Sequence, residues 1–175
     1  MGDENLKDLR KDFWNALRKQ FRESDTPLKP GGTKDGFWLL FKLGVRENKQ
    51  PTQQNIAIVW DDDGKSFHFV VIFYGQPKYP LTSGKYYPGY SREWYCFFQA
   101  KLDLINGQLR HKVDWVNHMP IEIGLRTEDF DAQIRKRNSW PRYIEEMKNV
   151  VQELHDAFDG SASTFELYHL RKQNR

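Results

Sequence analysis

The sequence predicts an α+β fold: a mainly antiparallel sheet of about five or six strands, with N-terminal and C-terminal helices packed on one face. Two patterns in the 175-residue chain support this prediction. Apolar residues recur at steps of three and four near both ends of the chain, as they do along one side of a helix. Between those ends, apolar and polar residues alternate, which is typical of strands with one buried face. Packing the helices against the sheet buries both kinds of apolar surface.

The first helix is predicted from about Asn5 to Arg22. Its apolar stripe consists of Leu6, Leu9, Phe13, Leu17 and Phe21. The opposite side carries mainly lysine and arginine and is therefore expected to face solvent. The prolines and glycines between Ser24 and Gly32 stop the helix and form a connector.

Three strands are predicted after this connector: Phe37–Val45, Asn55–Trp60 and Ser66–Tyr74. In the first of them, alternate side chains are apolar, so one face is able to enter a core. The second and third strands are separated by Asp61–Lys65, a short polar segment that contains Gly64. Because glycine accepts a positive φ, this segment predicts a tight hairpin turn.

The next part of the chain admits two interpretations. A long loop is predicted at Gly75–Tyr90, and the stretch Ser91–Ile105 then leads to Asn106-Gly107. A two-residue Asn-Gly turn predicts a hairpin, with strand-like alternation on both sides of the turn as far as Trp115. The alternative is a helix across Ser91–Ile105, with Gly107 as its C-terminal cap. The hairpin is favoured because a run of aromatic rings is an awkward start for a helix.

The C-terminal part is predicted to contain a short strand, a helical turn and a long helix. The strand is Ile121–Leu125, and Thr127 is expected to cap the helical turn after it. Helical spacing of apolar residues between Tyr143 and Phe158 predicts the long helix, which Gly160 is expected to end.

Residues 1–175 are predicted to be a single domain, because the sequence has no internal repeat and no low-complexity linker. The core of this domain is expected at about residues 5–160, with residues 161–175 as a tail. Within the tail, Thr164–Leu170 is expected to be an edge strand or a frayed end.

Composition and charge narrow the class of protein. The chain has 15% aromatic residues and a net charge of +3, which permits contact with polyanions without requiring it. No apolar run is long enough to span a membrane, so no membrane association is expected. The lone cysteine, Cys96, cannot form an intrachain disulfide, which favours a reducing, cytoplasmic location. No cofactor is predicted, because no cofactor motif is present.

Two weak signals point to metal chemistry. Asp61-Asp62-Asp63 is the densest negative charge, but the bidentate Glu of a Ca²⁺ loop does not follow it at the needed offset. A hairpin turn explains the three aspartates, so no metal ligand is predicted. Gln99-Ala100-Lys101 resembles the end of a nuclease site, where carboxylates hold a metal ion and a lysine steadies the attacking water. His68 and His111 are expected to be ordinary sheet residues rather than ligands.

The segment Tyr74–Tyr95 combines tyrosines with positive charges and is the strongest candidate for a binding surface. Its expected contact residues are Tyr79, Lys85, Tyr86, Tyr87 and Arg92. Rings stack on unpaired bases and cations neutralise phosphates, so single-stranded nucleic acid is one expected partner. Exposed rings beside positive charge suit a protein partner equally.

The sequence therefore predicts a non-catalytic binding or accessory domain, because paired acids, a catalytic triad and metal-ligand spacing are missing from it. One alternative is a metal-dependent, nuclease-like enzyme with its site near Lys101. The other is a small-molecule-binding domain with an enclosed apolar pocket between the sheet and the C-terminal helix.

A set of short motifs, most of which contain an aromatic ring, is spread over about residues 10–158. The motifs are Phe13-Trp14, Phe37-Trp38, Val113-Asp114-Trp115, Ile121-Glu122-Ile123, and Asp129-Phe130-Asp131 followed by Trp140 and Tyr143. In this layout the chain resembles an uncharacterised family of domains of unknown function, found alone or at the end of restriction- and nuclease-like proteins. The resemblance implies the order helix, three strands, helix, two strands, helix, which favours the helical interpretation of Ser91–Ile105. It implies no catalytic residue.

Overall fold

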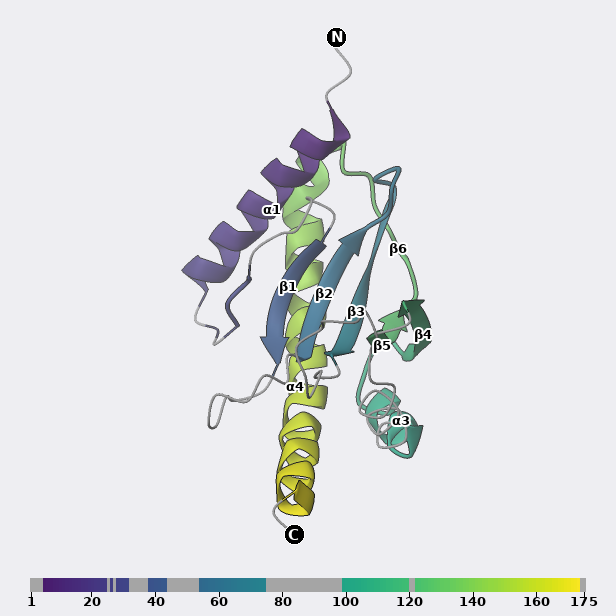
Figure 1. Ribbon diagram of the computed structural model, residues 1–175. Coiled ribbons are helices and arrows are strands. Elements are labelled where there is room, and N and C mark those ends of the chain that lie inside the picture. Colours follow the sequence, from purple (N-terminus) through teal and green to yellow (C-terminus); the bar gives the residue numbers. More distant parts are fainter. Residues whose placement is uncertain are drawn as a thin grey trace, which may run out of the picture.

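The computed structural model of the chain describes residues 5–24, 26, 28–31, 38–43, 54–74, 99–119 and 122–173. These residues form the predicted α+β fold, in which helices from both ends of the chain accompany an antiparallel sheet (Figure 1). The elements are α1 (Leu6–Glu23), β1 (Trp38–Leu43), β2 (Gln54–Trp60), β3 (Ser66–Tyr74), α3 (Leu102–Asn106), β4 (Val113–Met119), β5 (Glu122–Thr127), β6 (Phe130–Asp131), the 3-10 helix η1 (Arg137–Ser139) and α4 (Trp140–Gln173).

The sheet places β3 at its centre. Among the described residues, the strand order is β1-β2-β3-β5-β4, all antiparallel, and β6 pairs with β3 as well. The β2–β3 hairpin predicted from the turn residues is confirmed. β3 pairs with β5 over Val70–Tyr74 and with β6 over Ser66–Phe67. His68 and Phe69 lie between these two pairings, so the connection from β5 to β6 passes beside them.

The core lies between the sheet and helices α1 and α4, which share one face of the sheet (Figure 1). The predicted first helix is confirmed, and Asn5 caps it by accepting a hydrogen bond from the backbone N–H of Lys7 at 3.1 Å. Phe13 of α1 is fully buried and lies edge-on to Trp60 of β2 and Trp140 of α4, with ring centroids 5.2 and 5.3 Å apart. The two helices and the sheet are therefore joined through packed aromatic rings.

Polar side chains stand on the other face of the sheet. Phe69 enters the main core, so its neighbours His68 and Val70 lie on the face away from the helices. Val70 is directly opposite Arg126 of β5 in the strand register, which places Arg126 on the same face. A small apolar cluster formed by Ala57, Val70 and Ile72 lies there too. This face therefore combines a few apolar residues with a buried histidine and an arginine.

The hairpin predicted at Asn106-Gly107 is wrong. The described part of this stretch forms α3, and Gly107 has a φ of −66° rather than the positive φ of an Asn-Gly hairpin turn. The side-chain amide of Asn106 pairs with the backbone of Val113 instead: it donates to the carbonyl at 3.0 Å and accepts from the N–H at 2.9 Å. The amide thus takes the place of a strand partner at the start of β4. The helical alternative is confirmed for Leu102–Asn106, and residues 91–98 lie outside the described part of the chain.

The helical turn predicted after Thr127 is also wrong. Thr127 is the last residue of β5, and its hydroxyl accepts from the backbone N–H of Phe69 at 3.1 Å. The same hydroxyl donates to the carbonyl of Glu128 at 2.9 Å. These bonds hold the end of β5 against β3, so the chain continues into β6 rather than into a helix.

The long helix extends well beyond its predicted end. α4 passes through Gly160 and ends at Gln173, so Thr164–Leu170 is helical and not an edge strand. A single glycine inside a helix costs only about 1 kcal/mol, which a helix of this length tolerates. No helix in the described residues is both long enough and apolar enough to cross a lipid bilayer.

Candidate functional site

The binding residues predicted from the sequence are not tested by the structure. Tyr79, Lys85, Tyr86, Tyr87 and Arg92 all lie outside the described residues. The site described next involves residues from the β2–β3 hairpin and from the chain between β5 and β6.

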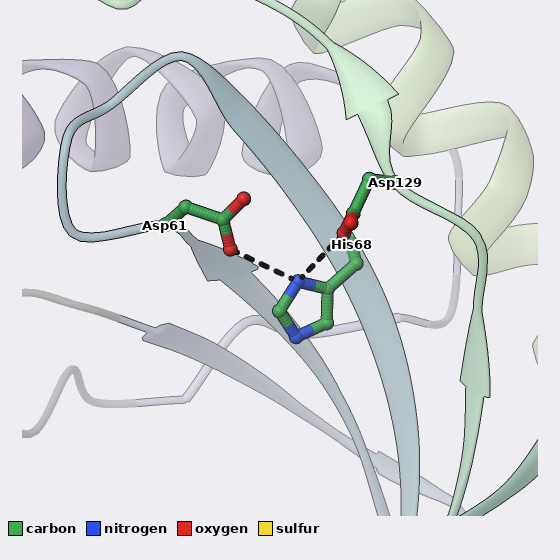
Figure 2. Close-up of side chains that lie close together, drawn as sticks. All are labelled: Asp61, His68 and Asp129. Carbon is green, nitrogen blue, oxygen red and sulfur yellow. Dashed lines mark ion pairs between the residues drawn. The ribbon is translucent and has the colours of Figure 1, made fainter.

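His68, Asp61 and Asp129 come together at one end of the sheet (Figure 2). Nδ1 of His68 lies 3.4 Å from Oδ1 of Asp61 and 3.5 Å from Oδ1 of Asp129. The His68 side chain is only 8% exposed, whereas the Asp61 and Asp129 side chains are 33% and 49% exposed. A buried imidazole therefore directs one nitrogen toward two carboxylates that are open to solvent on their other sides. We refer to these three residues as the Asp-His-Asp cluster.

The strand arrangement explains why these three residues meet. Asp61 directly follows β2 and His68 lies near the start of β3, so the hairpin brings them together. Gly64 makes the hairpin tight by adopting a φ of +68°, and its N–H bonds to the carbonyl of Asp61 at 2.9 Å. Asp129 lies in the connection between β5 and β6, which passes beside the gap in the β3 pairing. The cluster thus depends on a local turn and on one long-range strand pairing.

Asp61 is fixed in place by two further residues. The hydroxyl of Ser66 donates to Oδ2 of Asp61, which leaves Oδ1 directed to His68. Arg10 of α1 is buried and donates through Nη2 to the backbone carbonyls of Asp61 and Asp62, the latter at 2.9 Å. Burial lowers the pKa of Arg10, and the carboxylates of Asp62, Asp61 and Asp63 oppose this shift. Helix α1 therefore supports the hairpin that carries the cluster.

Arg126 adds a positive charge to the cluster. Its Nη2 donates to Oδ1 of Asp129 at 2.5 Å and lies 3.2 Å from Nδ1 of His68. Its Nε is buried and has no hydrogen-bond partner among the described residues. Only part of the guanidinium group is therefore satisfied by the cluster.

Neither protonation state of Nδ1 in His68 suits all of the neighbouring groups. Without a proton, Nδ1 is able to accept from Arg126, but its lone pair then faces the oxygens of Asp61 and Asp129. With a proton, Nδ1 donates to a carboxylate, but its hydrogen then lies close to the donor nitrogen of Arg126. A cation placed among the three ligand atoms would interact favourably with all of them.

The sequence interpretation of the three aspartates was correct in part. Asp63 belongs to the turn, as predicted: its side chain accepts from the backbone N–H of Lys65 at 2.9 Å. That hydrogen bond is the main reason why the pKa of Asp63 lies below its usual value, and the side-chain contact with Lys65 adds to it. Asp61, however, also belongs to the cluster, with His68, which the sequence placed in a sheet and not at a site. Asp129 was missed, because sequence spacing does not bring it near either residue.

An open groove lies beside the cluster, between α3 and strands β4 and β5. Its volume is about 750 Å³, and Arg126 belongs to its lining. The lining also includes two further cations, Arg110 and Lys112, and Trp115, a half-buried residue that also packs against the main core. The carboxylates of Asp114 and Glu128 face the same groove. We call this groove the α3 groove. Arg126 therefore lines the α3 groove and also contacts the Asp-His-Asp cluster.

The two alternatives from the sequence stay predictions. Lys101 stands at the N-terminal end of α3, and the nuclease-like site expected near it is not tested by the structure. Between Arg110 and α4 lies a second depression of about 390 Å³, lined by charged residues such as Arg142 and Glu145. It differs from the enclosed apolar pocket expected of a small-molecule-binding domain.

Comparison with known proteins does not place the chain in a family: no family model matches it, and neither a curated protein nor a solved structure matches it. The resemblance to the uncharacterised domain family is therefore not tested, and the described elements include β6 and η1 beyond the order that it implies. Membership of that family stays a prediction.

Proposed function

We propose that this chain is a non-catalytic binding domain that holds single-stranded nucleic acid in the α3 groove. The observation that supports this proposal is the combination of an aromatic ring with three cations: Trp115 lines the groove together with Arg110, Lys112 and Arg126. Proteins that bind single strands without strong sequence preference use this combination, because bases stack on rings and phosphates are neutralised by cations.

The three cations differ in how strongly they are already engaged. Arg110 pairs with Glu153 of α4 at 3.1 Å, and Arg126 pairs with Asp129. Both arginines are therefore already engaged in ion pairs, and the Arg110 side chain is 67% exposed. Lys112 is exposed and lines the groove, and among the described residues it takes part in no ion pair that a phosphate would first have to break.

We expect further contacts from the tyrosine- and lysine-rich segment, which precedes α3 in the sequence. This segment leads into residue 99, where the described chain resumes before α3. In this proposal Tyr79, Tyr86 and Tyr87 stack on bases next to those in the groove, while Lys85 and Arg92 meet phosphates. A reducing, cytoplasmic setting, suggested by the lone cysteine, is part of the same proposal.

The proposal is tested by fluorescence anisotropy with a labelled single-stranded oligonucleotide at two salt concentrations. We expect binding at low salt that weakens as salt rises, because phosphate neutralisation releases counterions. Lys112→Gln should weaken binding and lower the salt dependence by about one counterion. The matched control is Lys11→Gln, an exposed lysine of α1 that does not line the groove and should leave both quantities unchanged. The double variant Tyr86→Ala/Tyr87→Ala should lower affinity by about 1–3 kcal/mol per stacked base.

Three results would contradict the proposal. If the wild-type protein does not bind at low salt, a protein partner becomes the better explanation of the tyrosine- and lysine-rich segment. If Lys11→Gln weakens binding as much as Lys112→Gln, the attraction is a general effect of charge and not of the groove. If the oligonucleotide is cleaved when Mg²⁺ or Mn²⁺ is added, the domain is an enzyme and the nuclease alternative replaces this proposal.

A further inference from the structure

We infer that Asp61, His68 and Asp129 form a binding site for a divalent first-row transition-metal ion such as Zn²⁺. This inference does not rest on the proposed nucleic-acid contact, since its three ligand residues do not line the α3 groove, although Arg126 borders both sites. It is drawn from the geometry of the three ligand atoms, from their chemistry and from the position of Arg126.

The distances between the ligand atoms fit a small metal ion. Zinc lies about 2.0–2.2 Å from nitrogen and oxygen ligands, which places neighbouring ligands of a tetrahedral site about 3.4 Å apart. Nδ1 of His68 is 3.4 Å from Oδ1 of Asp61 and 3.5 Å from Oδ1 of Asp129. All three ligand atoms lie within 4.8 Å of one another. Two edges of the site therefore already have the required length, and rotation of the half-exposed Asp129 side chain is able to close the third.

The donor set also suits such an ion. One imidazole nitrogen and two carboxylate oxygens favour zinc or manganese, whereas a site for Mg²⁺ uses oxygen donors and water. The two carboxylates balance the charge of a dication. Ser66 donates to the other oxygen of Asp61 and so orients that carboxylate, as residues around metal ligands commonly do. The solvent-exposed sides of Asp61 and Asp129 leave a path by which an ion can enter.

Arg126 marks the place where a cation is favoured. Its Nη2 already contacts two of the three ligand residues, His68 and Asp129. A metal ion would contact all three residues and would resolve the conflict at Nδ1 of His68, which the arginine does not. Because Arg126 also lines the α3 groove, its guanidinium group has open space into which it can move. The ion and the arginine therefore compete for one position.

The test is isothermal titration calorimetry of the untagged full chain after chelator treatment, with Zn²⁺ and Mg²⁺ in separate experiments. We expect one Zn²⁺ per chain and much weaker binding of Mg²⁺. Asp61→Asn and His68→Gln should each weaken Zn²⁺ binding by about tenfold or more, because each removes a ligand. Arg126→Gln should bind Zn²⁺ as tightly as the wild-type protein or more tightly, because a competing charge is gone.

Two matched controls keep the test specific. Asp62→Asn removes the neighbouring exposed carboxylate, and His155→Gln removes another histidine that lies next to an acid, Asp156, at 3.3 Å. Neither variant should change Zn²⁺ affinity by more than about twofold. If Asp61→Asn fails to fold, Asp129→Asn replaces it, since that side chain is half-exposed. Absence of Zn²⁺ binding in the wild-type protein, equal losses in the controls, equally tight Mg²⁺ binding, or weaker binding in Arg126→Gln would each overturn the inference.

Discussion

Replacing Gly64 by alanine should strongly destabilise the domain, because two separate physical effects act at this position. Gly64 has a φ of +68°, a conformation that residues with a Cβ adopt only with strain. A Cβ built on Gly64 would also lie 2.7 Å from Cγ2 of Ile134 and 2.9 Å from Cδ1 of Leu6. The backbone around Gly64 cannot easily move away, since its N–H bonds to Asp61 and its carbonyl accepts from Ile134 at 3.0 Å.

The magnitude follows from these two effects. The left-handed backbone conformation costs about 1–2 kcal/mol for an L-residue. Forcing an extra carbon into a packed contact costs about 1–3 kcal/mol more. We therefore expect Gly64→Ala to lower the free energy of unfolding by about 2–5 kcal/mol. Gly107→Ala provides the matched control: φ is −66° there, and the new Cβ would lie 3.4 Å from its nearest neighbours, the carbonyl oxygens of Asp103 and Leu104.

Urea unfolding followed by circular dichroism measures both variants. Gly107→Ala should be neutral or should gain about 0.4–1 kcal/mol, because alanine reduces the conformational entropy of the unfolded chain. The reasoning is refuted if Gly64→Ala lies within 1 kcal/mol of the wild-type protein, or if both glycine variants lose the same stability. An unchanged Gly64→Ala variant would mean that the hairpin turn relaxes without strain, so that Asp61 is not held by it.

Two further substitutions test other parts of the fold. Asn106→Ala should lower the free energy of unfolding by about 1–3 kcal/mol, because it leaves the N–H and the carbonyl of Val113 without their partner. Asn106→Asp keeps the acceptor but places a carboxylate oxygen against the carbonyl of Val113, so it should lose stability too, and unchanged urea unfolding of both variants would contradict these two bonds. Phe13→Ala should cost about 3–5 kcal/mol, since the ring is fully buried and contacts Trp60 and Trp140. Near-ultraviolet circular dichroism should also lose tryptophan signal; an unchanged spectrum would contradict the edge-on packing of these rings.

The sequence alone was sufficient where the controlling interactions are local. The apolar stripe of α1 follows from helical spacing of Leu9, Phe13 and Leu17, which needs no distant contact. The β2–β3 hairpin follows from alternation on both sides of a turn that contains Gly64. The α+β class follows from the helical and the alternating spacing of apolar residues, because each spacing determines which surface of its element must be buried.

The interpretation of Asn106-Gly107 failed because a tertiary contact decided it. The dipeptide is compatible with a hairpin turn or with a helix end, and the two bonds between Asn106 and Val113 favour the helix end. Those bonds form only when α3 meets the start of β4. Local sequence preference cannot predict this contact, because the backbone of Val113 is positioned by the sheet.

The Asp-His-Asp cluster also combines a contact that the sequence predicts with one that only the tertiary structure decides. Asp61 and His68 are brought together by the hairpin, so their proximity was within reach of the sequence once the hairpin had been predicted. Asp129 joins them only because β5 and β6 both pair with β3 and leave His68 between them. The sequence determined α1, the start of α4, the strands β1, β2 and β3, and the turn that carries Asp61. The tertiary structure alone decided the cluster, because strand order depends on burying apolar faces across the whole sheet and not on the spacing of residues along the chain.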